Sequence, residues 1–415
     1  MPPDRPRRDG PAPDHWRRAA LAVWVVALIL LGAKALLLPH RNTVYPIFAG
    51  AGRHWLEGAD LYETPAGHDP YRYSPLVAAF FVPLSQLPDG AAGLLWRLIA
   101  AAAFLGGIAG WSRAVLPPTL TRVQRALLFL LPAPLALGNV HNGQANILII
   151  GLLLLAVAAV ARARFPLAGA CLAVACLFKL YPIAVGLLLV ALYPRRLAPR
   201  LALALAAGLA LPFLLQRPDY VATQYVSWVK HLASNDRQVL PRAYWYRDAR
   251  LLCSLWVGPM SYGAYQMLQG IGAGVVAGAC LWARRSGLTQ GRLLTLLLGL
   301  GCCWMTALGP ATESSTYVLL GPTAAWLLLS GGAEHHPFGL RLLWVTGYGL
   351  LVASQAASTL PGGWGRAAQS LGPQPLAALL FLGGLLYLAV SWRRLPLGAN
   401  AKPQAATGVV VGARR

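Results

Sequence analysis

Long runs of apolar residues, separated by short polar stretches, recur along the whole chain. Many approach the roughly 20 residues that an α-helix needs to cross the hydrocarbon core of a bilayer. Because a spanning segment must satisfy its own backbone hydrogen bonds, and because the runs are too continuous for barrel strands, we expect an all-α polytopic membrane protein. The pattern predicts about twelve transmembrane helices, at 19–38, 92–112, 124–140, 145–161, 166–179, 181–194, 198–216, 262–283, 292–309, 315–331, 341–357 and 375–392.

The predicted helices form one transmembrane domain, residues 19–392, in which we find no convincing internal repeat. Residues 1–18 are rich in Pro and Arg and predict a disordered N-terminal tail. Residues 393–415 are polar and rich in Gly and Ala, which predicts a loose C-terminal tail. The run from Ala19 to Leu38 is long for a signal peptide and no small-residue cleavage site follows it, so we expect an uncleaved first helix.

One apolar segment, "YSPLVAAFFVPLSQLP" at 73–88, is too short and too interrupted to be a span. Pro75, Pro83 and Pro88 break it, whereas a spanning helix needs about 17–25 residues. We therefore expect an interfacial or re-entrant helix within the first outer loop. Counting this segment as a span would move much of the basic charge to the wrong side of the membrane.

The distribution of basic residues predicts how the chain is oriented in the membrane. With the twelve spans above, 22 of the 35 Lys and Arg residues lie on the side of the two termini. This asymmetry follows the positive-inside rule, so we expect cytoplasmic termini and large outer loops at 39–91 and 217–261. The net charge of +22 is thereby explained as an orientation signal, and we expect no nucleic-acid partner.

The composition also bears on the class of protein and on metal binding. Only 12% of the residues are charged, against roughly 25% in a soluble domain, and 57% are hydrophobic. The six cysteines lie mostly in apolar runs and form no CxxC pair or His/Cys ligand pattern, so we expect neither a disulfide framework nor a protein-built metal site. A divalent cation as a cofactor is the alternative.

The few acidic residues gather on the predicted outer side. Nine of the thirteen lie there, and four of those, Glu57, Asp60, Glu63 and Asp69, fall within 13 positions of the first outer loop. Asp69 directly precedes the predicted surface helix, where a carboxylate could meet both a lipid-borne donor and an acceptor from outside. Asp60 is the second candidate, although it could instead cap its loop or pair with Arg53 or Arg72. Carboxylates in this place suit a proton acceptor.

A cluster of amides lies at the outer mouth between two predicted spans, in "NVHNGQANILIIGLLLLA" at 139–156. Its polar members include Asn139, His141, Gln144 and Asn146. Desolvated amides need partners, so they could bind the hydroxyls of a polar ligand. A tight hairpin with helix-capping Asn and Gly explains the same pattern equally well.

Lys179 lies late in an apolar run and is followed by Pro182. An ionisable residue at membrane depth is costly and marks a candidate functional site, and a flexible ammonium suits a phosphate. Extension of the side chain to the outer interface is the alternative. For Lys34 and Arg97, near the outer ends of their spans, we expect that simpler explanation.

The second outer loop contains "HLASNDRQVLPRAYWYRDARLL" at 231–252, in which arginines alternate with aromatic residues. Arg242 and Arg247 could bind a phosphate bidentately, although an interfacial amphipathic helix would have the same composition. Glu313, in "LGPATESSTYVLLGP", is the only acid in the predicted spans of the second half or in their short outer turns. It could bind a ligand or cap a helix.

Several of these segments resemble one family of membrane enzymes. "GRHWLEGADLY", "YRYSPLVAAFFVPLSQLP", "NGQANILIIGLLLLA" and "AGACLAVACLFKLYPIAVGLLLVALYPRR" are similar to motifs of glycosyltransferase family 87, in the family's order and spacing. The likeness extends over about residues 20–215. It implies a GT-C type fold and transfer of a sugar, mannose in the best-known members, from a polyprenyl-phosphate donor on the outer face. In the family an Asp just before the first loop tyrosine acts as general base, whereas Arg41 and Asn42 stand there in this chain.

We therefore expect a cell-membrane hexosyltransferase that takes a mannose-like sugar from a polyprenyl-phosphate donor and passes it to a lipid or glycan acceptor. The alternatives are a lipid or small-molecule transporter and a catalytically inactive homologue. Asp69, and after it Asp60, are the expected catalytic residues. The expected donor-binding residues are Lys179, Arg72, His141, Gln144, Asn146, Arg242, Arg247 and Glu313.

Overall fold

A computed structural model describes residues 15–63, 69–233, 237, 239–333, 336–361 and 363–392. Throughout these residues the chain forms helices, turns and irregular loops and contains no strand, which confirms the predicted all-α class. The predicted C-terminal tail and most of the predicted N-terminal tail lie outside the described residues. The first helix begins at His15, so residues 15–18 are helical and do not belong to a disordered tail as predicted.

Each of the twelve predicted spans contains helix. The helices of the first half are α1 (His15–Leu37), α2 (Tyr45–Glu57), α3 (Pro75–Ser85), α4 (Asp89–Ala114), α5 (Arg122–Leu130), α6 (Ala133–Asn142), α7 (Asn146–Ala161), α8 (Phe165–Phe178), α9 (Ile183–Leu192), α10 (Pro194–Ala210) and α11 (Pro212–Leu215). Those of the second half are α12 (Pro218–Ala233), the short 3-10 helix η1 (Arg242–Tyr244), α13 (Ala249–Trp256), α14 (Tyr262–Arg285), α15 (Gln290–Ala307), the 3-10 helix η2 (Ser314–Leu320), α16 (Gly321–Ala333), α17 (Phe338–Ala357), α18 (Trp364–Gln369) and α19 (Pro373–Ser391).

Six helical segments of the described chain are long and apolar enough to cross a membrane, so the chain is a multi-pass membrane protein. They are His15–Leu37, Asp89–Ala114, Arg122–Asn142, Pro194–Leu215, Tyr262–Arg285 and Trp364–Ser391. Other predicted spans are shorter than a bilayer is thick, such as α7 with 16 residues and α8 with 14. The predicted total of about twelve is therefore not confirmed.

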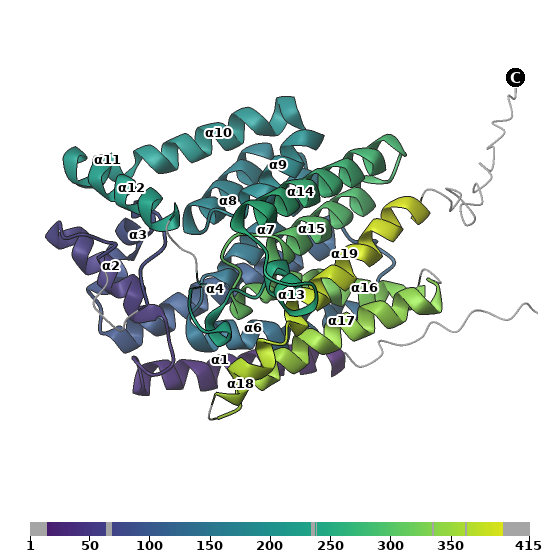
Figure 1. The fold of residues 1–415 in the computed structure, drawn as a ribbon, viewed down its shortest axis with the longest axis horizontal. Coiled ribbons are helices and arrows are strands. Elements are labelled where there is room, and N and C mark those ends of the chain that lie inside the picture. The colour runs from purple at the N-terminus through teal and green to yellow at the C-terminus, as the bar shows by residue number, and fades with distance from the viewer. Residues whose placement is uncertain are drawn as a thin grey trace, which may run out of the picture.

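The centre of the fold is α7, whose side chains are almost all buried. It packs against α4, and the two backbones approach closely at a pair of glycines. A Cβ atom on Gly151 would lie 2.5 Å from the Ala103 carbonyl, and one on Gly107 would lie 2.6 Å from the Gly151 carbonyl oxygen. Larger residues would force these helices apart. Figure 1 shows α10 to α12 along the upper edge of the molecule and α1 along the lower edge, with α4, α7 and α8 between them.

The segment predicted to be a short surface helix forms α3, an 11-residue helix that contains Pro83. It packs against α2, where a Cβ on Gly52 would lie 2.9 Å from the Phe81 carbonyl oxygen. The hydroxyl of Ser74, at the start of α3, donates to the carbonyl of Leu177 in the last turn of α8 at 2.7 Å. This bond joins the first predicted outer loop to the end of α8. The position of α3 relative to a bilayer remains a prediction.

The two predicted outer loops contact each other. From α12, the hydroxyl of Tyr220 donates to the carbonyl of Ala59 at 2.7 Å. The Gln224 side-chain oxygen accepts from the N–H of Leu61 at 2.9 Å. The fold thus brings the acid-rich first loop and the arginine-rich second loop to the same end of the helices, as Figure 1 shows for α2, α3 and α12.

Candidate functional site

A cavity of about 310 Å³ lies where the two predicted outer loops meet the ends of α8 and α15. Its lining combines apolar side chains such as Ile47 and Leu232 with many polar and charged ones. The polar and charged residues of the lining are Asp69, Arg72, Tyr73, Gln144, Lys179, Tyr181, Asp248, Arg250, Tyr265, Gln269 and Glu313. Tyr246, Tyr262 and Trp245 add aromatic rings.

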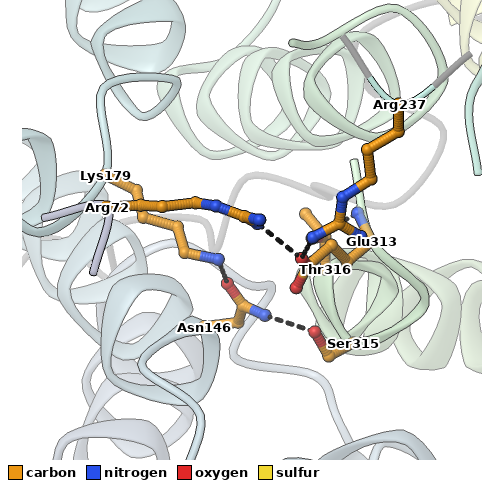
Figure 2. A network of polar contacts seen from close by, with 7 residues as sticks. All are labelled: Arg72, Asn146, Lys179, Arg237, Glu313, Ser315 and Thr316. Atoms are coloured by element: carbon orange, nitrogen blue, oxygen red, sulfur yellow. Dashed lines mark hydrogen bonds and ion pairs between the residues drawn. The ribbon is translucent and has the colours of Figure 1, made fainter. Parts of the chain in front are cut away.

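The cavity wall includes part of a cluster of three cations and one carboxylate, which we call the cation cluster: Arg72, Lys179, Arg237 and Glu313. Arg72, Lys179 and Glu313 line the cavity, and Arg237 contacts Glu313 from outside the lining. Figure 2 shows the two guanidinium groups approaching the Glu313 carboxylate from opposite sides. Arg72 Nη1 and Arg237 Nη2 lie 3.1 and 3.0 Å from Glu313 Oε1. The three side chains are 22–27% exposed, so they are partly desolvated but reachable from the cavity side.

Lys179 completes the cation cluster from the end of α8. It is the C-cap of that helix and has an extended backbone, which releases the side chain from the helix surface. Its ammonium donates to Asn146 Oδ1 at 2.9 Å, and Tyr181 donates to the same oxygen, also at 2.9 Å. Asn146 Nδ2 donates to Ser315 Oγ at 3.0 Å, so its amide orientation is fixed by η2 (Figure 2). Among the described residues, no carboxylate forms an ion pair with Lys179.

The charges of the cation cluster favour an anionic ligand. Three positive groups and one negative group give a local charge of +2. Burial alone would raise the pKa of Glu313, but Lys179, Arg237 and Arg72 outweigh it, and the pKa lies below its ordinary value. Glu313 is therefore ionised, and it is poorly suited to accept a proton. Its capping contact with Thr316 is also present, so the capping function predicted as an alternative coexists with the ion pairs.

The acids of the first loop differ in their relation to the cavity. Asp69 is exposed and lines the cavity. Asp60 does not line it, and its carboxylate accepts from the N–H of Tyr62 at 2.9 Å, which makes it a loop cap. Glu57 and Glu63 are exposed and also lie outside the lining. Arg53, one predicted partner of Asp60, pairs instead with Asp89 at 2.5 Å.

The tyrosines next to Asp69 have structural partners. The Tyr62 hydroxyl donates to the carbonyl of Tyr73 at 2.7 Å, and the Tyr71 hydroxyl donates to the carbonyl of Ser74 at 3.0 Å. The Arg72 carbonyl accepts from the indole of Trp228 at 3.2 Å. These bonds fix the backbone around Arg72, and they place its side chain at the cavity.

The predicted donor-binding residues divide into two groups. Arg72, Lys179, Gln144 and Glu313 line the cavity, and Asn146 is bonded to Lys179. His141, Arg242 and Arg247 do not line it. Arg242 is exposed, and the buried Arg247 guanidinium donates to the backbone carbonyls of Ala243 and Arg242 at 2.8 and 3.4 Å.

The hairpin that carries His141 is held together by Arg97, for which the sequence predicted extension to the interface. That prediction is wrong, because Arg97 is only 3% exposed. Its guanidinium donates to the carbonyls of Val140, Gly93 and His141 at 2.9, 2.8 and 3.1 Å. A buried guanidinium needs such acceptors, and two carbonyls of the hairpin and one of α4 supply them. Most of the 139–143 segment therefore has a structural role, while Gln144 and Asn146 face the site.

Two charged residues of the site were missed as individual candidates. Arg237 belongs to the predicted arginine-rich loop but was not distinguished from its neighbours. Asp248 was part of the same stretch, and it proves to be a buried N-cap of α13 that lines the cavity. Burial raises its pKa to about 6, which the hydrogen bond from the Leu251 N–H only partly counteracts. The sequence contained a weak signal for the capping role of Asp248, because an Asp directly before an apolar helical run is typical of a helix N-cap.

No group of three or more His, Cys, Asp or Glu side chains within the described parts of the chain could hold a metal ion.

The sequence matches a model of one protein family. The model of glycosyltransferase family 87 matches residues 71–309, which is 239 of the 415 residues. No curated protein matches the chain.

Similar solved structures include crystal structures of ArnT from Cupriavidus metallidurans. The form bound to undecaprenyl phosphate is 16% identical, with a TM-score of 0.41, over 91% of this chain and 78% of that one. The apo form is 15% identical, with a TM-score of 0.41, over 90% and 77%. Likeness of this degree does not indicate a shared substrate.

Proposed function

Because this chain belongs to glycosyltransferase family 87, we propose that its cavity binds a polyprenyl-phosphate-linked sugar and that the chain transfers this sugar to an acceptor hydroxyl. The observation that carries the proposal is the cation cluster, which has a charge of +2 and contributes Arg72, Lys179 and Glu313 to the cavity wall. The phosphate of the donor is the anion we assign to it. Each charge-assisted hydrogen bond to a phosphate contributes roughly 1.5–3 kcal/mol.

Arg72 has an N–H group without a hydrogen-bond partner, which could bind this phosphate. Its Nη1 is engaged by Glu313, but its buried Nε has no hydrogen-bond partner among the described residues. A buried donor without a partner costs about 1–3 kcal/mol, which an anionic ligand would recover. In this proposal Glu313 holds the two guanidinium groups in place, and Lys179 supplies a mobile ammonium beside them.

The apolar part of the lining suits the lipid of the donor. Leu180 follows Lys179 directly, lines the cavity and is 54% exposed. Leu232 and Ile47 line the same cavity. A polyprenyl chain could thus leave the phosphate site along apolar side chains toward the surrounding lipid. A small soluble anion would gain nothing from these contacts.

The proposed reaction needs a proton acceptor. The acceptor hydroxyl attacks the anomeric carbon, the bond from that carbon to the phosphate oxygen breaks, and the electron pair stays on the leaving phosphate. The cation cluster would stabilise the charge that develops there. We assign the proton to Asp69, because it lines the cavity from the exposed rim where an acceptor would enter, whereas Asp60 caps a loop outside it.

The finer features of the function follow from the family resemblance. They are a GT-C mechanism on the outer face of the cell membrane, a mannose-like hexose and a lipid or glycan acceptor. Cytoplasmic termini follow from the charge distribution. Cysteine at position 63, in a background without Cys253, should react with an impermeant reagent from outside, and cysteine at position 289 should not. The reverse pattern would refute the orientation.

The test of the activity uses purified protein in lipid nanodiscs with a panel of polyprenyl-phosphate hexoses and candidate glycan or lipid acceptors. We expect sugar-dependent release of polyprenyl phosphate and a glycosylated acceptor. The Lys179→Met variant should be strongly impaired and the Lys34→Met variant should not. Binding of the donor without any release across the panel would favour an inactive homologue. Movement of an intact lipid across the bilayer would favour a transporter.

A further inference from the structure

Two buried polar side chains line the cavity without belonging to the cation cluster: Asp248 and Tyr265. They are 5% and 4% exposed. Asp248 precedes α13, and Tyr265 lies in the first turn of α14, so two separate elements bring them to one place. Burial of two such groups is costly unless they have hydrogen-bond partners in the protein or in a ligand.

The backbone that carries Asp248 is fixed. The N–H of Arg247 donates to the carbonyl of Thr312 at 2.7 Å, and the hydroxyl of Tyr317 donates to the carbonyl of Arg247 at 2.6 Å. These bonds attach the residue before Asp248 to the segment that carries Glu313. The Asp248 carboxylate is therefore held in a constant position relative to the cation cluster.

The hydrogen-bonding capacity of the pair is incompletely used. One Asp248 oxygen accepts from the Leu251 N–H at 3.2 Å. The Tyr265 hydroxyl acts on this carboxyl as a hydrogen-bond donor, but the contact departs from normal hydrogen-bond geometry, and the hydroxyl has no other partner among the described residues. A carboxylate has about four acceptor sites and a phenol can both donate and accept. The pair can thus receive hydroxyl groups from a ligand.

The surroundings of this pair suit a sugar ring. Trp245, Tyr246 and Tyr262 line the same cavity and contribute aromatic rings to it. The Tyr246 ring is fixed by Arg237, whose guanidinium carbon lies 4.7 Å from the ring centroid. Ligand sites typically combine such aromatic walls with a few fixed polar groups that determine orientation and specificity.

We propose that Asp248 and Tyr265 form the sugar subsite of the cavity, in which the carboxylate accepts hydrogen bonds from hydroxyls of the donor's hexose and the phenol completes their coordination. The inference rests on the proposed function, because the sugar is taken to be attached to the phosphate at the cation cluster. Asp248 and Tyr265 would then distinguish a glycosylated donor from the bare lipid phosphate that remains after transfer.

Charged and titratable groups surround Asp248 on several elements. Arg247 directly precedes it, Arg250 and Cys253 belong to α13, Tyr265 belongs to α14 and Tyr317 belongs to η2. Arg250 lies near enough to favour the ionised carboxylate, which is the form that accepts the strongest hydrogen bonds. Asn at position 248 would keep the helix cap and the shape but lose the charge.

The experiment compares two dissociation constants for each variant in nanodiscs, one for polyprenyl phosphate and one for the best polyprenyl-phosphate hexose of a panel. Their ratio measures the contribution of the sugar. We expect the wild-type protein to bind the glycosylated lipid about 10-fold to 100-fold more tightly. Asp248→Asn and Tyr265→Phe should each remove most of this ratio and leave the dissociation constant of polyprenyl phosphate within about twofold.

Matched controls are Asp60→Asn, a loop cap outside the cavity, and Tyr348→Phe, whose hydroxyl donates to the Leu131 carbonyl at 2.8 Å away from the lining. Both should keep the wild-type ratio. Unchanged ratios in the two site variants, or a wild-type ratio near one with tight binding of the bare lipid, would overturn the sugar subsite while the phosphate site stands. Failure of the wild-type protein to bind either lipid would overturn the proposed function itself, and the subsite with it.

Discussion

Replacing Lys179 by methionine is the sharpest single test of the phosphate site. The change removes one of three positive charges from the cation cluster and keeps a long apolar side chain. At about 4 Å and an effective dielectric constant of about 20, a charge pair is worth roughly 4 kcal/mol. The phosphate must replace the contact between the ammonium and Asn146 Oδ1, at 2.9 Å, and some water. A net contribution of about 1.5–3 kcal/mol remains, as for other hydrogen bonds to charged groups.

This magnitude predicts that Lys179→Met weakens polyprenyl-phosphate binding by about 10-fold to 150-fold. The fold should change little, because Asn146 Oδ1 keeps the hydrogen bond from Tyr181 at 2.9 Å. The assay is titration of nanodisc-embedded protein with a polyprenyl phosphate, together with a thermal unfolding curve. Lys34→Met is the control, since Lys34 lies outside the cavity lining and donates to the Asn42 carbonyl at 3.3 Å.

A dissociation constant for Lys179→Met within about twofold of the wild-type value, with an unchanged unfolding midpoint, would refute the reasoning. The ammonium would then have only its contact with Asn146. Equal weakening in Lys34→Met would also count against a local site, because it would indicate a general effect of net charge at the membrane surface.

Three other variants or conditions give independent tests. Glu313→Gln removes the carboxylate that pairs with Arg72 and Arg237, so its thermal unfolding should show a loss of about 1–3 kcal/mol, less than for a fully buried pair because the three side chains are 22–27% exposed; an unchanged unfolding curve would contradict the cluster. Asp69→Asn should lower turnover about 10²–10⁴-fold at unchanged donor affinity, and Asp60→Asn should have less effect; equal turnover in both variants would exclude Asp69 as the base. The pKa of Asp248 is raised to about 6 by burial, so the sugar-dependent part of donor affinity should be complete above pH 7 and should fall as the carboxylate is protonated below pH 6; a ratio independent of pH, measured with the two lipids, would contradict that assignment.

The sequence predicted those site residues that stand out against an apolar background. Lys179 was identifiable because a lysine near the end of an apolar run is costly without a partner, and Glu313 because acids are rare in the second half of the chain. Arg72 was found through the acid-rich stretch of the first loop. These residues could be identified from their neighbours along the chain, without knowledge of contacts between distant segments.

Other features depend on contacts between distant segments and were not predictable in the same way. Arg97 resembles an interfacial arginine in its own helix, and only the 139–143 hairpin packed against α4 explains its burial. Asp248 acquires its position through the attachment of its loop to η2, near Thr312 and Tyr317. The helices were predictable from apolar runs, but their number as spans was not, since a short buried helix such as α7 has the same apolar composition as a spanning one.

The central claim, that the cation cluster holds the phosphate of a polyprenyl-linked donor, is tested most directly by an experimental structure of the protein in nanodiscs with bound polyprenyl phosphate. The account predicts phosphate density within hydrogen-bond distance of Lys179 Nζ and Arg72 Nε, with the lipid chain leaving past Leu180. Density for the phosphate elsewhere, with the Arg72–Glu313–Arg237 contacts and the Lys179–Asn146 bond unchanged beside an empty cavity, would contradict it.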